Sequence, residues 1–449
     1  ETAEFRDFQK GIELVIVHMP LLCSKLKPKT MITYLNFRNK KQPVKIKPSK
    51  RKTRHIRKPE YGHGKLSKVS HQKRKDGQKM KKFGFGLMRL PLLDPDDHTS
   101  VDIEKVKKMA DQFLENGFTY FDTAYPYHGG HSEIAFREAV AKQYPHSAYT
   151  ITDKLSMFMI RKEEEIPVFF EGQLERLGVD YVDYYWLHGL NKQTYLQAEK
   201  MHAFEFIQQK KAEGKIRHIG LSFHDRAEVL EEILNAHPEM EYVQIQLNYL
   251  DWEDPAIEAR LCYEIATKHG KPVIVMEPIK GGSLIQVSDQ AREIFQQARP
   301  DLSIASWAIR FAASPANVMM VLSGMSNEEQ MEDNISYMKD FQPLNETEQK
   351  ALDKAVESIR ALSIIPCTAC RYCVDTCPKK IAIPDYFAIY NNLKRGGQLA
   401  GLTSGMYYGN LTETHGKASE CLKCGKCEKL CPQHLTIRKY LEDVAKTLE

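Results

Sequence analysis

From Lys82 onward, short apolar runs alternate with longer stretches in which apolar residues recur at helical spacing. The short runs are rich in β-branched and aromatic residues, and their lengths suit strands. Eight of them are expected as strands: residues 83–88, 119–122, 149–152, 182–187, 216–222, 242–248, 272–277 and 318–323. Helices are expected between them, including residues 101–116, 163–177, 201–213, 256–269 and 304–313. This alternation indicates βα units and a parallel sheet.

Glycines mark the ends of several expected helices. Gly117, Gly178, Gly214 and Gly270 stand where a left-handed residue would close a helix. Eight strands alternating with helices over about 250 residues suit a (β/α)8 barrel better than an open sheet. No G-x-G-x-x-G sequence follows a strand, which argues against the open dinucleotide-binding fold that carries this motif. We therefore expect a barrel over residues 80–345.

The segments that flank the barrel differ from it in composition. Residues 346–362 have helical spacing and are expected as a linking helix, followed by a small α-helical, cysteine-rich domain over residues 363–449. Residues 1–79 are basic and poor in apolar side chains, so they cannot bury enough surface to fold alone. We expect a disordered extension there. A basic arm that binds nucleic acid is the alternative, although regular aromatic interleaving is missing.

The net charge of +5 conceals two regions of opposite sign. Residues 1–82 hold 24 Lys and Arg against 6 Asp and Glu, and the remainder holds 40 against 53. Because the main body is acidic, we do not expect nucleic acid as a partner of the folded protein. The apolar run at residues 12–23 is shorter than the roughly 18 residues that a membrane span requires, and it contains Glu13. Nothing resembles a secretory signal, and we expect a cytoplasmic protein without a membrane anchor.

Polar side chains follow three of the expected strands, at the face where barrel enzymes place their chemistry. Asp122 ends the second strand, Lys154 follows the third and His188 the fourth, and Tyr127 stands on the loop after the second. The set suits reduction of a carbonyl group, whose oxygen gains negative charge as hydride reaches its carbon. Tyrosine can protonate that oxygen, and a lysine cation beside it lowers its pKa from about 10. An aspartate fixes the lysine, and a histidine can donate a hydrogen bond to the developing charge.

The same residues resemble the motif of the aldo-keto reductase family. Asp122 and Tyr127 lie five apart in the sequence Phe-Asp-Thr-Ala-Tyr-Pro-Tyr, and Lys154 and His188 complete a counterpart of the family's catalytic tetrad. The resemblance runs in the correct order over residues 83–340. It implies a (β/α)8 barrel and nicotinamide-dependent carbonyl reduction or alcohol oxidation. Three further histidines lie close to these positions: His128, His131 and His224. They are either substrate contacts or ordinary loop residues.

The resemblance also implies where a nicotinamide cofactor binds. Ser222, in the sequence Gly-Leu-Ser, and Gln244 match the family's site for the carboxamide, and Asn334 matches an asparagine at the adenine end. Pro278 and the loop that ends at Gly282 resemble the segment over the pyrophosphate. NADP and NAD are both candidates for the cofactor.

Four positions depart from the family pattern. Phe223 stands where an asparagine often follows the serine, and Met276 replaces the aromatic residue that usually stacks on nicotinamide. Near Gly324 and Gln330 the family often has the Lys and Arg that bind an adenosine 2′-phosphate. Their absence weakens the case for NADP, but not for nicotinamide use. The usual N-terminal hairpin that closes the bottom of the barrel is not recognisable either.

Eight of the ten cysteines lie in two copies of one motif, C-x2-C-x2-C-x3-C-P. The first three cysteines of a copy can bind three irons of a 4Fe–4S cluster, while the fourth reaches the other cluster. This pattern resembles the two-cluster bacterial ferredoxins. It implies one ligand set of Cys367, Cys370, Cys373 and Cys431, and a second of Cys421, Cys424, Cys427 and Cys377. Structural zinc is the alternative, because paired C-x2-C sequences also form zinc ribbons.

Together these features predict an oxidoreductase with a nicotinamide-dependent barrel site and two 4Fe–4S clusters. The expected substrate is a small carbonyl compound or alcohol, and a redox partner protein is a candidate to exchange electrons with the clusters. A different class stays open, namely a redox-sensing or electron-transfer adaptor that keeps a nucleotide-binding barrel. No convincing flavin fingerprint is present, although barrel proteins can bind flavin through phosphate loops.

Overall fold

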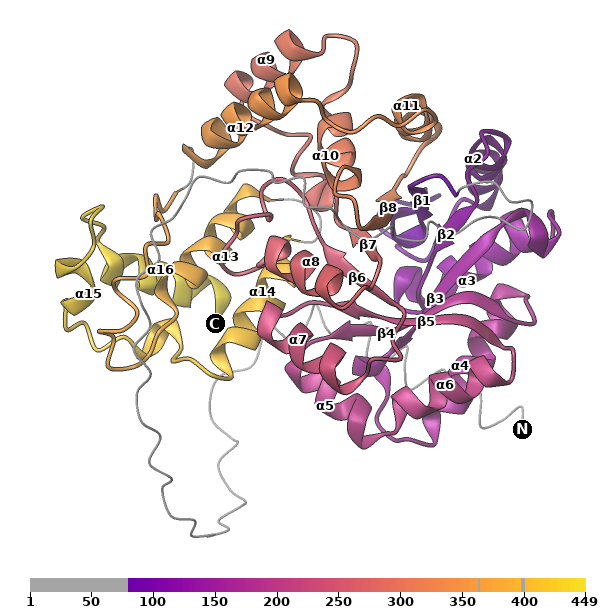
Figure 1. Cartoon of the computed structure of the whole chain (residues 1–449), viewed down its shortest axis with the longest axis horizontal. Helices are drawn as coiled ribbons and strands as arrows, with labels where there is room; N and C mark the ends of the chain where they lie inside the picture. Colours follow the sequence, from indigo (N-terminus) through magenta and orange to yellow (C-terminus); the bar gives the residue numbers. More distant parts are fainter. Residues whose placement is uncertain (1–79, 362–363, 397–399) are drawn as a thin grey trace. The chain divides into compact units, whose positions relative to one another are not determined.

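Eight parallel strands close into a barrel in the order β1 to β8, and helices surround it (Figure 1). The computed structural model describes residues 80–361, 364–396 and 400–449, which all lie in the unit Val69–Glu449. The extension expected over residues 1–79 falls outside the described residues. The barrel predicted from the sequence is confirmed.

The strands begin close to where the sequence predicts and differ mainly in where they end. They are β1 (Phe83–Gly86), β2 (Tyr120–Asp122), β3 (Thr150–Ser156), β4 (Val182–Leu190), β5 (Ile216–Phe223), β6 (Tyr242–Gln246), β7 (Val273–Met276) and β8 (Val318–Gly324). β3 and β4 run further than expected because their later residues still pair with each other, with Ser156 opposite His188. The extra length carries polar side chains on both strands to the mouth of the barrel.

Helices connect the strands, and their ends follow local rules. They include α2 (Ile103–Glu115), α3 (His131–Phe136), α4 (Glu165–Leu177), α5 (Lys192–Lys200), α6 (Ala203–Ala212), α7 (Ala227–Ala236), α8 (Ala259–Lys268), α9 (Asp289–Ala298), α10 (Ile304–Ala313) and α11 (Glu328–Met338). The Asp102 side chain accepts a hydrogen bond from a backbone N–H in the first turn of α2. The predicted helix-closing glycines have φ between 68° and 77°, which confirms that prediction: Gly117, Gly178, Gly214 and Gly270.

Large side chains fill the barrel interior beneath its mouth. The cluster comprises Tyr120, Tyr184, Trp186, Tyr242, Ile274, Met320 and Leu322. Gly220 fits among these rings because a Cβ there would lie 2.5 Å from the Tyr242 carbonyl oxygen and 2.6 Å from Trp186. Met80, just before β1, packs against the same cluster. The filled interior leaves the chemistry to the carboxyl ends of the strands.

Helix α12 (Glu346–Ala361), expected as a linker, packs along α9 on the outside of the barrel. Glu348 forms ion pairs with Arg310 at 2.8 Å and with Arg299 at 2.7 Å. Burial acts to raise the pKa of this carboxyl, but hydrogen bonds from Arg310 and from the Asn345 backbone hold it below its usual value. Leu352 is 1% exposed. We therefore propose that the domain boundary follows α12.

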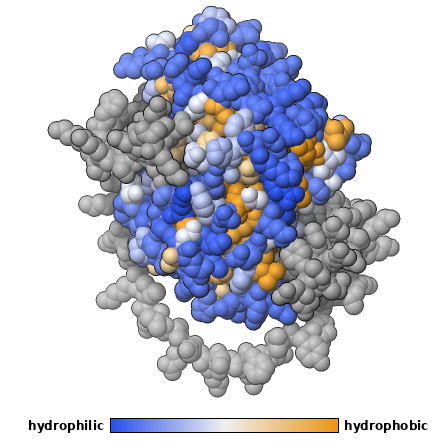
Figure 2. Space-filling view, turned by 90° about the vertical axis from the view of Figure 1, so that its right-hand side faces the viewer, coloured by the Kyte–Doolittle hydropathy of each residue, from blue (hydrophilic) through white to orange (hydrophobic). Residues whose placement is uncertain are grey.

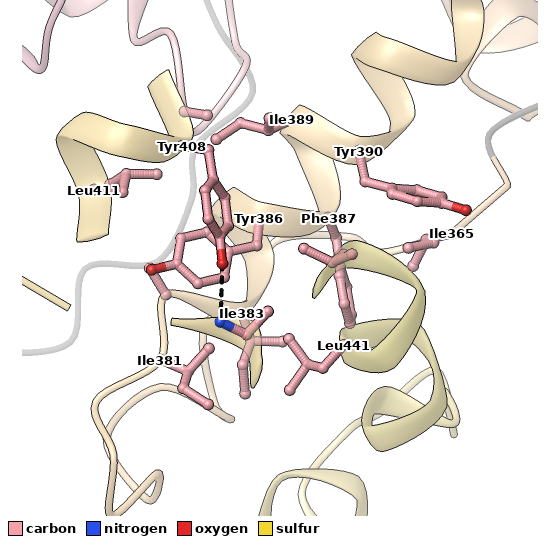
Figure 3. Close-up of a cluster of buried hydrophobic side chains, with 14 of the residues drawn as sticks. Ile365, Ile381, Ile383, Tyr386, Phe387, Ile389, Tyr390, Tyr408, Leu411 and Leu441 are labelled. Carbon is pink, nitrogen blue, oxygen red and sulfur yellow. Dashed lines mark hydrogen bonds between the residues drawn. The ribbon is translucent and has the colours of Figure 1, made fainter. Parts of the chain in front are cut away.

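The cysteine-rich segment is largely helical, as the sequence predicts. Its helices are α13 (Ile383–Arg395), α14 (Ala400–Thr412), α15 (Lys426–Lys429) and α16 (Ile437–Leu448). Tyr386, Phe387 and Leu441 lie in a core built from α13, α14 and α16 (Figure 3). In that core the Tyr408 hydroxyl accepts a hydrogen bond from the Ala418 backbone N–H at 2.9 Å.

The core of the helical segment also includes residues of the barrel. Ala256, Ile257 and Ala259, around the start of α8, are buried in the same apolar cluster as Tyr386. The asparagine side chain of Asn392 in α13 adds a hydrogen bond to the barrel loop residue Asp254 at 3.1 Å. Barrel and cysteine-rich segment therefore share one packed boundary.

Apolar side chains on the surface form separate groups. The face in Figure 2 is mainly hydrophilic, with small apolar patches between polar side chains. In the cysteine-rich segment, Tyr372 and Leu422 are 62% and 60% exposed. Across the described ranges, no helix is both long enough and apolar enough to cross a membrane.

Candidate active site

Asp122 and Lys154 form a buried ion pair at the carboxyl ends of β2 and β3. The lysine Nζ donates to Asp122 Oδ1 at 2.6 Å and to the Thr123 carbonyl oxygen at 2.7 Å. The two side chains are 4% and 0% exposed. Burial disfavours the lysine cation, but the Asp122 carboxylate outweighs burial and raises the pKa of Lys154. Lys154 therefore stays protonated.

Tyr127 lies in the turn after β2, beside Lys154. Its hydroxyl is 3.4 Å from the lysine Nζ, which also lies 4.9 Å from the centre of the tyrosine ring. Burial raises the pKa of the Tyr127 hydroxyl above its ordinary value, and Lys154 acts in the opposite direction. The sequence predicted a net decrease. That prediction is wrong for the chain alone, because burial outweighs the lysine.

His188 faces Tyr127 from β4, and Ser156 on β3 orients it. The two rings are nearly perpendicular, at 87°, with centres 6.0 Å apart. His188 Nδ1 lies 2.9 Å from Ser156 Oγ. When the serine donates this bond, the neutral imidazole carries its proton on Nε2. Burial lowers the pKa of His188 well below its ordinary value, and Lys154 adds to the effect.

His224 is a second imidazole near this group, just beyond β5. Burial, together with the charge of Lys154, lowers the pKa of His224 to about 4. Its Nδ1 is buried and has no hydrogen-bond partner within the part of the chain that the structure describes. Its backbone N–H donates to the Leu190 carbonyl oxygen at 2.8 Å. The sequence left two interpretations of His224 open, and its place beside the catalytic candidates favours a substrate contact.

The residues predicted to hold the nicotinamide carboxamide lie side by side. Ser222 on β5 is the register partner of Gln244 on β6, and both are buried. The Gln244 amide donates to Asp122 Oδ2 at 3.4 Å, and Met276 Sδ lies 3.9 Å from Ser222 Oγ. A hydroxyl and an amide next to the ion pair can satisfy both ends of a carboxamide. The residues present therefore fit a nicotinamide, and their role stays a prediction.

The loop after β7 makes a glycine turn that leaves open space. Gly281 and Gly282 have φ of 63° and 92°, and a Cβ at Gly282 would meet no atom within 4 Å. The Lys280 Nζ forms an ion pair with Asp251 in the same region. The open turn leaves room for a bound group to approach the backbone, whereas the charge of Lys280 is balanced by Asp251. Pro278 is buried at the start of this loop.

Asn334 of α11 is bound within the barrel itself. Its Nδ2 donates to Ser323 Oγ at 3.1 Å, and its Oδ1 accepts from the Tyr337 hydroxyl. The side chain is 3% exposed. These bonds fix its orientation, and a contact to adenine stays a prediction.

Arg89 is a cation that the sequence analysis missed. It follows β1, and its side chain lies so close to Gly324 that a Cβ there would be 3.0 Å from Arg89 Cδ. Burial lowers the pKa of Arg89, and the charge of Glu277 opposes the shift. A cation from a distant part of the chain thus lies beside Gly324, near the positions where the sequence lacks a lysine and an arginine. Closure of the barrel, which pairs β1 with β8, brings it there.

The eight cysteines of the two motifs line two separate cavities. One cavity is lined by Cys367, Cys370, Cys373 and Cys431. The other is lined by Cys377, Cys421, Cys424 and Cys427. The fourth cysteine of each motif thus lies with the first three of the other motif. This is the crossed grouping that the sequence predicts.

Each cavity has four cysteine thiols in its lining, which is the number of ligands that a 4Fe–4S cluster takes. Burial, with the neighbouring thiols, raises the pKa of Cys373 to about 12 and that of Cys427 to about 11. Without a bound cation these thiols stay protonated, so binding of a cluster would release their protons.

Comparison with known families identifies two matching regions. The Aldo/keto reductase family matches residues 82–357, and a 4Fe-4S dicluster domain matches residues 366–436. The second match confirms the iron–sulfur prediction for the C-terminal domain. No position-by-position role follows from either match.

Curated relatives match the barrel at low identity. An uncharacterized oxidoreductase, YqkF, of Bacillus subtilis is 25% identical over 279 residues, covering 56% of this chain and 89% of the relative. L-galactose dehydrogenase of Arabidopsis thaliana is 26% identical, covering 54% and 80%. NADH-specific methylglyoxal reductase of Escherichia coli is 24% identical, covering 49% and 78%. These relatives have counterparts for the barrel.

Solved structures support the same fold. A thermostable aldo-keto reductase, Tm1743, is 22% identical with a TM-score of 0.50, covering 63% of this chain and 98% of that structure. The holo form of aldo-keto reductase AKR11C1 from Bacillus halodurans is also 22% identical with a TM-score of 0.50, covering 62% and 93%. At this identity the likeness concerns the fold.

Proposed function

Because the chain belongs to the aldo/keto reductase family, we propose that its barrel reduces a small carbonyl compound, or oxidises the alcohol, with NADP or NAD. The chain is an oxidoreductase of this family with a C-terminal 4Fe–4S domain. The observation that supports the proposal is the position of Lys154, which contacts both Asp122 and Tyr127. His188 faces the same tyrosine from the next strand but one.

The proton chemistry follows from these contacts. A bound reduced nicotinamide supplies hydride to the carbonyl carbon. Tyr127 donates its proton to the carbonyl oxygen, since burial keeps the phenol protonated beforehand. Lys154 stabilises the phenolate that remains, and Asp122 holds the lysine in place. Solvent then returns a proton to Tyr127.

His188 orients the reacting carbonyl group. Its Nδ1 is bonded to Ser156, so the Nε2–H is available to the substrate oxygen. Burial keeps the imidazole neutral, and a neutral donor adds no second positive charge beside Lys154. The hydrogen bond strengthens as the oxygen gains charge, which favours the transition state over the bound substrate.

The nucleotide lies along the carboxyl ends of β5 to β8 in this proposal. Ser222 and Gln244 hold the carboxamide, and the loop from Pro278 to Gly282 covers the pyrophosphate. Asn334 lies at the adenine end. Arg89, beside Gly324, supplies a cation for the nucleotide phosphates in place of the residues absent there.

The C-terminal domain exchanges single electrons with a redox partner in this proposal. Its two cavities hold two 4Fe–4S clusters, each bound by four cysteines. Leu422, Lys379 and Lys426 line the second cavity, and the two lysines are exposed. An exposed apolar residue and two lysines at one cavity suit an acidic electron-carrier protein, because charge complementarity speeds encounter.

Replacement of Tyr127 by phenylalanine tests the barrel chemistry. We expect turnover with a panel of aldehydes to fall by about a hundredfold or more, because the proton donor is lost. Nucleotide affinity, measured by fluorescence titration, should change by less than about twofold. Tyr144→Phe is the matched control, because it removes a hydroxyl that binds Asp111 away from the site. Normal turnover in Tyr127→Phe contradicts the assignment.

An adaptor that only retains a barrel has no need of this arrangement. A buried ion pair such as Asp122–Lys154 adds little to stability once its desolvation is counted. Its retention beside Tyr127 is better explained by chemistry. Steady-state turnover with aldehydes and quinones distinguishes the two functions, since an adaptor turns over neither.

A further inference from the structure

Helix α14 is buried on two faces. Tyr408 and Leu411 lie in the core of the cysteine-rich domain (Figure 3). Thr403, Tyr407 and Asn410 are spaced by four and three residues, so they share another face of the helix. Tyr407 is 3% exposed, and it packs in the same apolar cluster as the barrel residues around the start of α8. The second face of α14 therefore lies against the barrel.

This second face reaches the loop after β7, which the proposed function assigns to the pyrophosphate. The Thr403 hydroxyl donates a long hydrogen bond, of 3.4 Å, to Glu277, the first residue after β7. A cavity between the barrel and the iron–sulfur domain is lined by residues of both, among them Glu277, Lys280, Asn392, Thr403, Ser404 and Tyr407. Near the other end of the helix, Asn410 donates to the His224 carbonyl oxygen at 2.8 Å. Helix α14 is thus bonded to the barrel near both of its ends.

The loop after β7 has a backbone shape that most residues avoid. Four of the six residues 277–282 have a positive φ. Two of the four are glycines, but the other two are Glu277 and Lys280, with φ of 52° and 48°. A residue with a side chain costs free energy in this left-handed region, and it stays there only where the surrounding structure holds it. The contacts around the loop therefore decide whether it keeps its shape.

The barrel holds the loop from one side. The Asn248 amide donates to the Glu277 carbonyl oxygen at 3.2 Å and to Asp251 Oδ2 at 2.5 Å. Asp251 in turn forms the ion pair with Lys280, and the two side chains are 0% and 9% exposed. Ion pairs in contact with water contribute little, so this pair depends on what covers it. Helices α13 and α14, which form the other wall of the cavity, supply that cover.

The iron–sulfur domain holds the loop from the other side. Thr403 bonds the loop directly, and Asn392 of α13 donates to Asp254 at 3.1 Å, in the barrel loop that also carries Asp251. The Asn392 amide is itself oriented by Arg395, which donates to its oxygen at 2.8 Å. The two barrel loops that are joined by the buried ion pair are therefore each bonded to the iron–sulfur domain.

We propose that the iron–sulfur domain is part of the nucleotide site, with Thr403 and Tyr407 as positioning residues that hold the loop from Glu277 to Gly282 in the shape that binds the pyrophosphate. The inference rests on the proposed reductase function and adds a means of regulation to it. Because a domain of this kind depends on its clusters to fold, a chain that has lost them holds the loop less firmly and binds the nucleotide more weakly. The link is structural and requires no electron transfer between the clusters and the nicotinamide.

Removal of the iron tests this dependence. We expect the iron-free full chain, prepared by anaerobic chelation, to bind NADPH or NADH with a dissociation constant about tenfold or more above that of the iron-loaded chain, because only the fraction of molecules with a formed loop binds. Calorimetric titration measures both constants, and reconstitution with iron and sulfide should restore the lower one. Tryptophan emission reports whether the barrel stays folded, because all three tryptophans belong to it.

Two substitutions in α14 test the contact with the clusters in place. Thr403→Val keeps the shape of the side chain and removes its hydroxyl, so the dissociation constant should rise about threefold. Tyr407→Ala removes the ring that packs against the barrel, and we expect a rise of about tenfold, with the iron content measured alongside. Thr412→Val is the matched control on the same helix, because its hydroxyl bonds to the Gly409 carbonyl oxygen at 2.9 Å. It should leave the constant unchanged.

ADP-ribose separates the two halves of the nucleotide site. It carries the pyrophosphate but no nicotinamide, so in the proposed arrangement it contacts the loop after β7 and leaves Ser222 and Gln244 without a ligand. We expect iron removal and both variants to weaken the binding of ADP-ribose by about the same factors as that of the full nucleotide. A loss confined to the full nucleotide would assign the effect to the nicotinamide end and overturn the positioning role.

The remaining outcomes are decisive as well. An unchanged dissociation constant in an iron-free chain whose barrel is folded overturns the inference. Normal affinity in both Thr403→Val and Tyr407→Ala with full iron also overturns it, because an effect of the iron would then not pass through α14. If the barrel unfolds without iron, or if Tyr407→Ala loses its iron, the comparison of Thr403→Val with Thr412→Val decides. None of these results contradicts the proposed function, whereas no saturable binding of either nucleotide to the iron-loaded wild type overturns that function together with the inference.

Discussion

The barrel and the iron–sulfur domain are stabilised by different means. In the barrel every strand pairs with two neighbours, and side chains such as Trp186 and Phe121 are fully buried. The iron–sulfur domain has a small core around Tyr386 and leaves Tyr372 and Leu422 exposed beside their cysteines. Core burial is enough for a domain of the first kind, whereas small domains of the second kind depend on bound metal. A cofactor is therefore a reagent in the barrel but also part of the structure in the C-terminal domain.

Loss of a cluster ligand should produce the largest difference between the two regions. We expect about eight irons per wild-type chain and about half as many in Cys424→Ser, with the C-terminal domain becoming protease-sensitive while the barrel stays folded. Iron analysis and limited proteolysis measure both effects. Cys262→Ser, at a buried barrel thiol, should keep all its iron. About one zinc and little iron in the wild type would contradict the assignment of two 4Fe–4S clusters.

The ion pairs of α12 test which region that helix belongs to. Glu348→Gln leaves Arg310 buried without its carboxylate, and we expect the barrel to lose about 3 kcal/mol of unfolding free energy. Trp186, Trp252 and Trp307 are the three tryptophans of the chain, so their fluorescence in urea reports the barrel.

Glu346→Gln is the control on the same helix, at an exposed position. It should change the unfolding free energy by less than about 0.5 kcal/mol. A loss below about 1 kcal/mol in Glu348→Gln would mean that α12 is not a stabilising part of the barrel.

Acid should weaken the barrel through His224. Its pKa is about 4 in the folded chain, against about 6.5 when unfolded. The unfolded chain therefore binds a proton first as pH falls, and stability is lost from about pH 6.5 down to about pH 4, roughly 3 kcal/mol in all. In urea titrations followed by tryptophan fluorescence, the unfolding free energy of His224→Asn should fall by about 3 kcal/mol less than that of the wild type over this pH range. Equal pH slopes in both proteins would refute this account.

The last prediction concerns electron transfer from the barrel to the iron–sulfur domain. We expect that it does not occur directly. Nicotinamide gives up two electrons as hydride, whereas each 4Fe–4S cluster accepts one, and a flavin is the usual agent that divides the pair. We expect reduced nicotinamide alone to leave the cluster absorbance unchanged on anaerobic rapid mixing with flavin-free protein. Bleaching at a rate comparable to turnover would disprove this separation.

Local signals carried most of what the sequence could predict. The strands follow from runs of β-branched and aromatic residues, and the cysteine sets follow from one repeated spacing. Asp122, Lys154 and His188 were found because each stands at or near a strand end. Ser156 could have been found in the same way, because alternation along β3 places it on the same side as Lys154.

Long-range packing decided the rest. Helix α14 contains Gly401, Gly405 and Gly409, whose weak helix propensity hides it in the sequence, and burial of its two other faces stabilises it. The contact between Asn410 and His224 joins residues 186 positions apart, which no local pattern reveals. The predicted direction of the Tyr127 pKa shift was wrong, because the sequence shows the neighbouring lysine but not how deeply the hydroxyl is buried.

The shared boundary around Ala256, Ile257 and Ala259 affects how this protein could be re-engineered. A C-terminal ferredoxin-type domain is an obvious candidate for deletion, or for fusion to another enzyme. Truncation after α12 would expose these three apolar side chains near the mouth of the barrel, and such a patch favours aggregation. A transplant would have to carry the loop before α8 with it, and a minimal reductase would need polar replacements at these positions. The unit of exchange in this chain is therefore the tail together with one barrel loop.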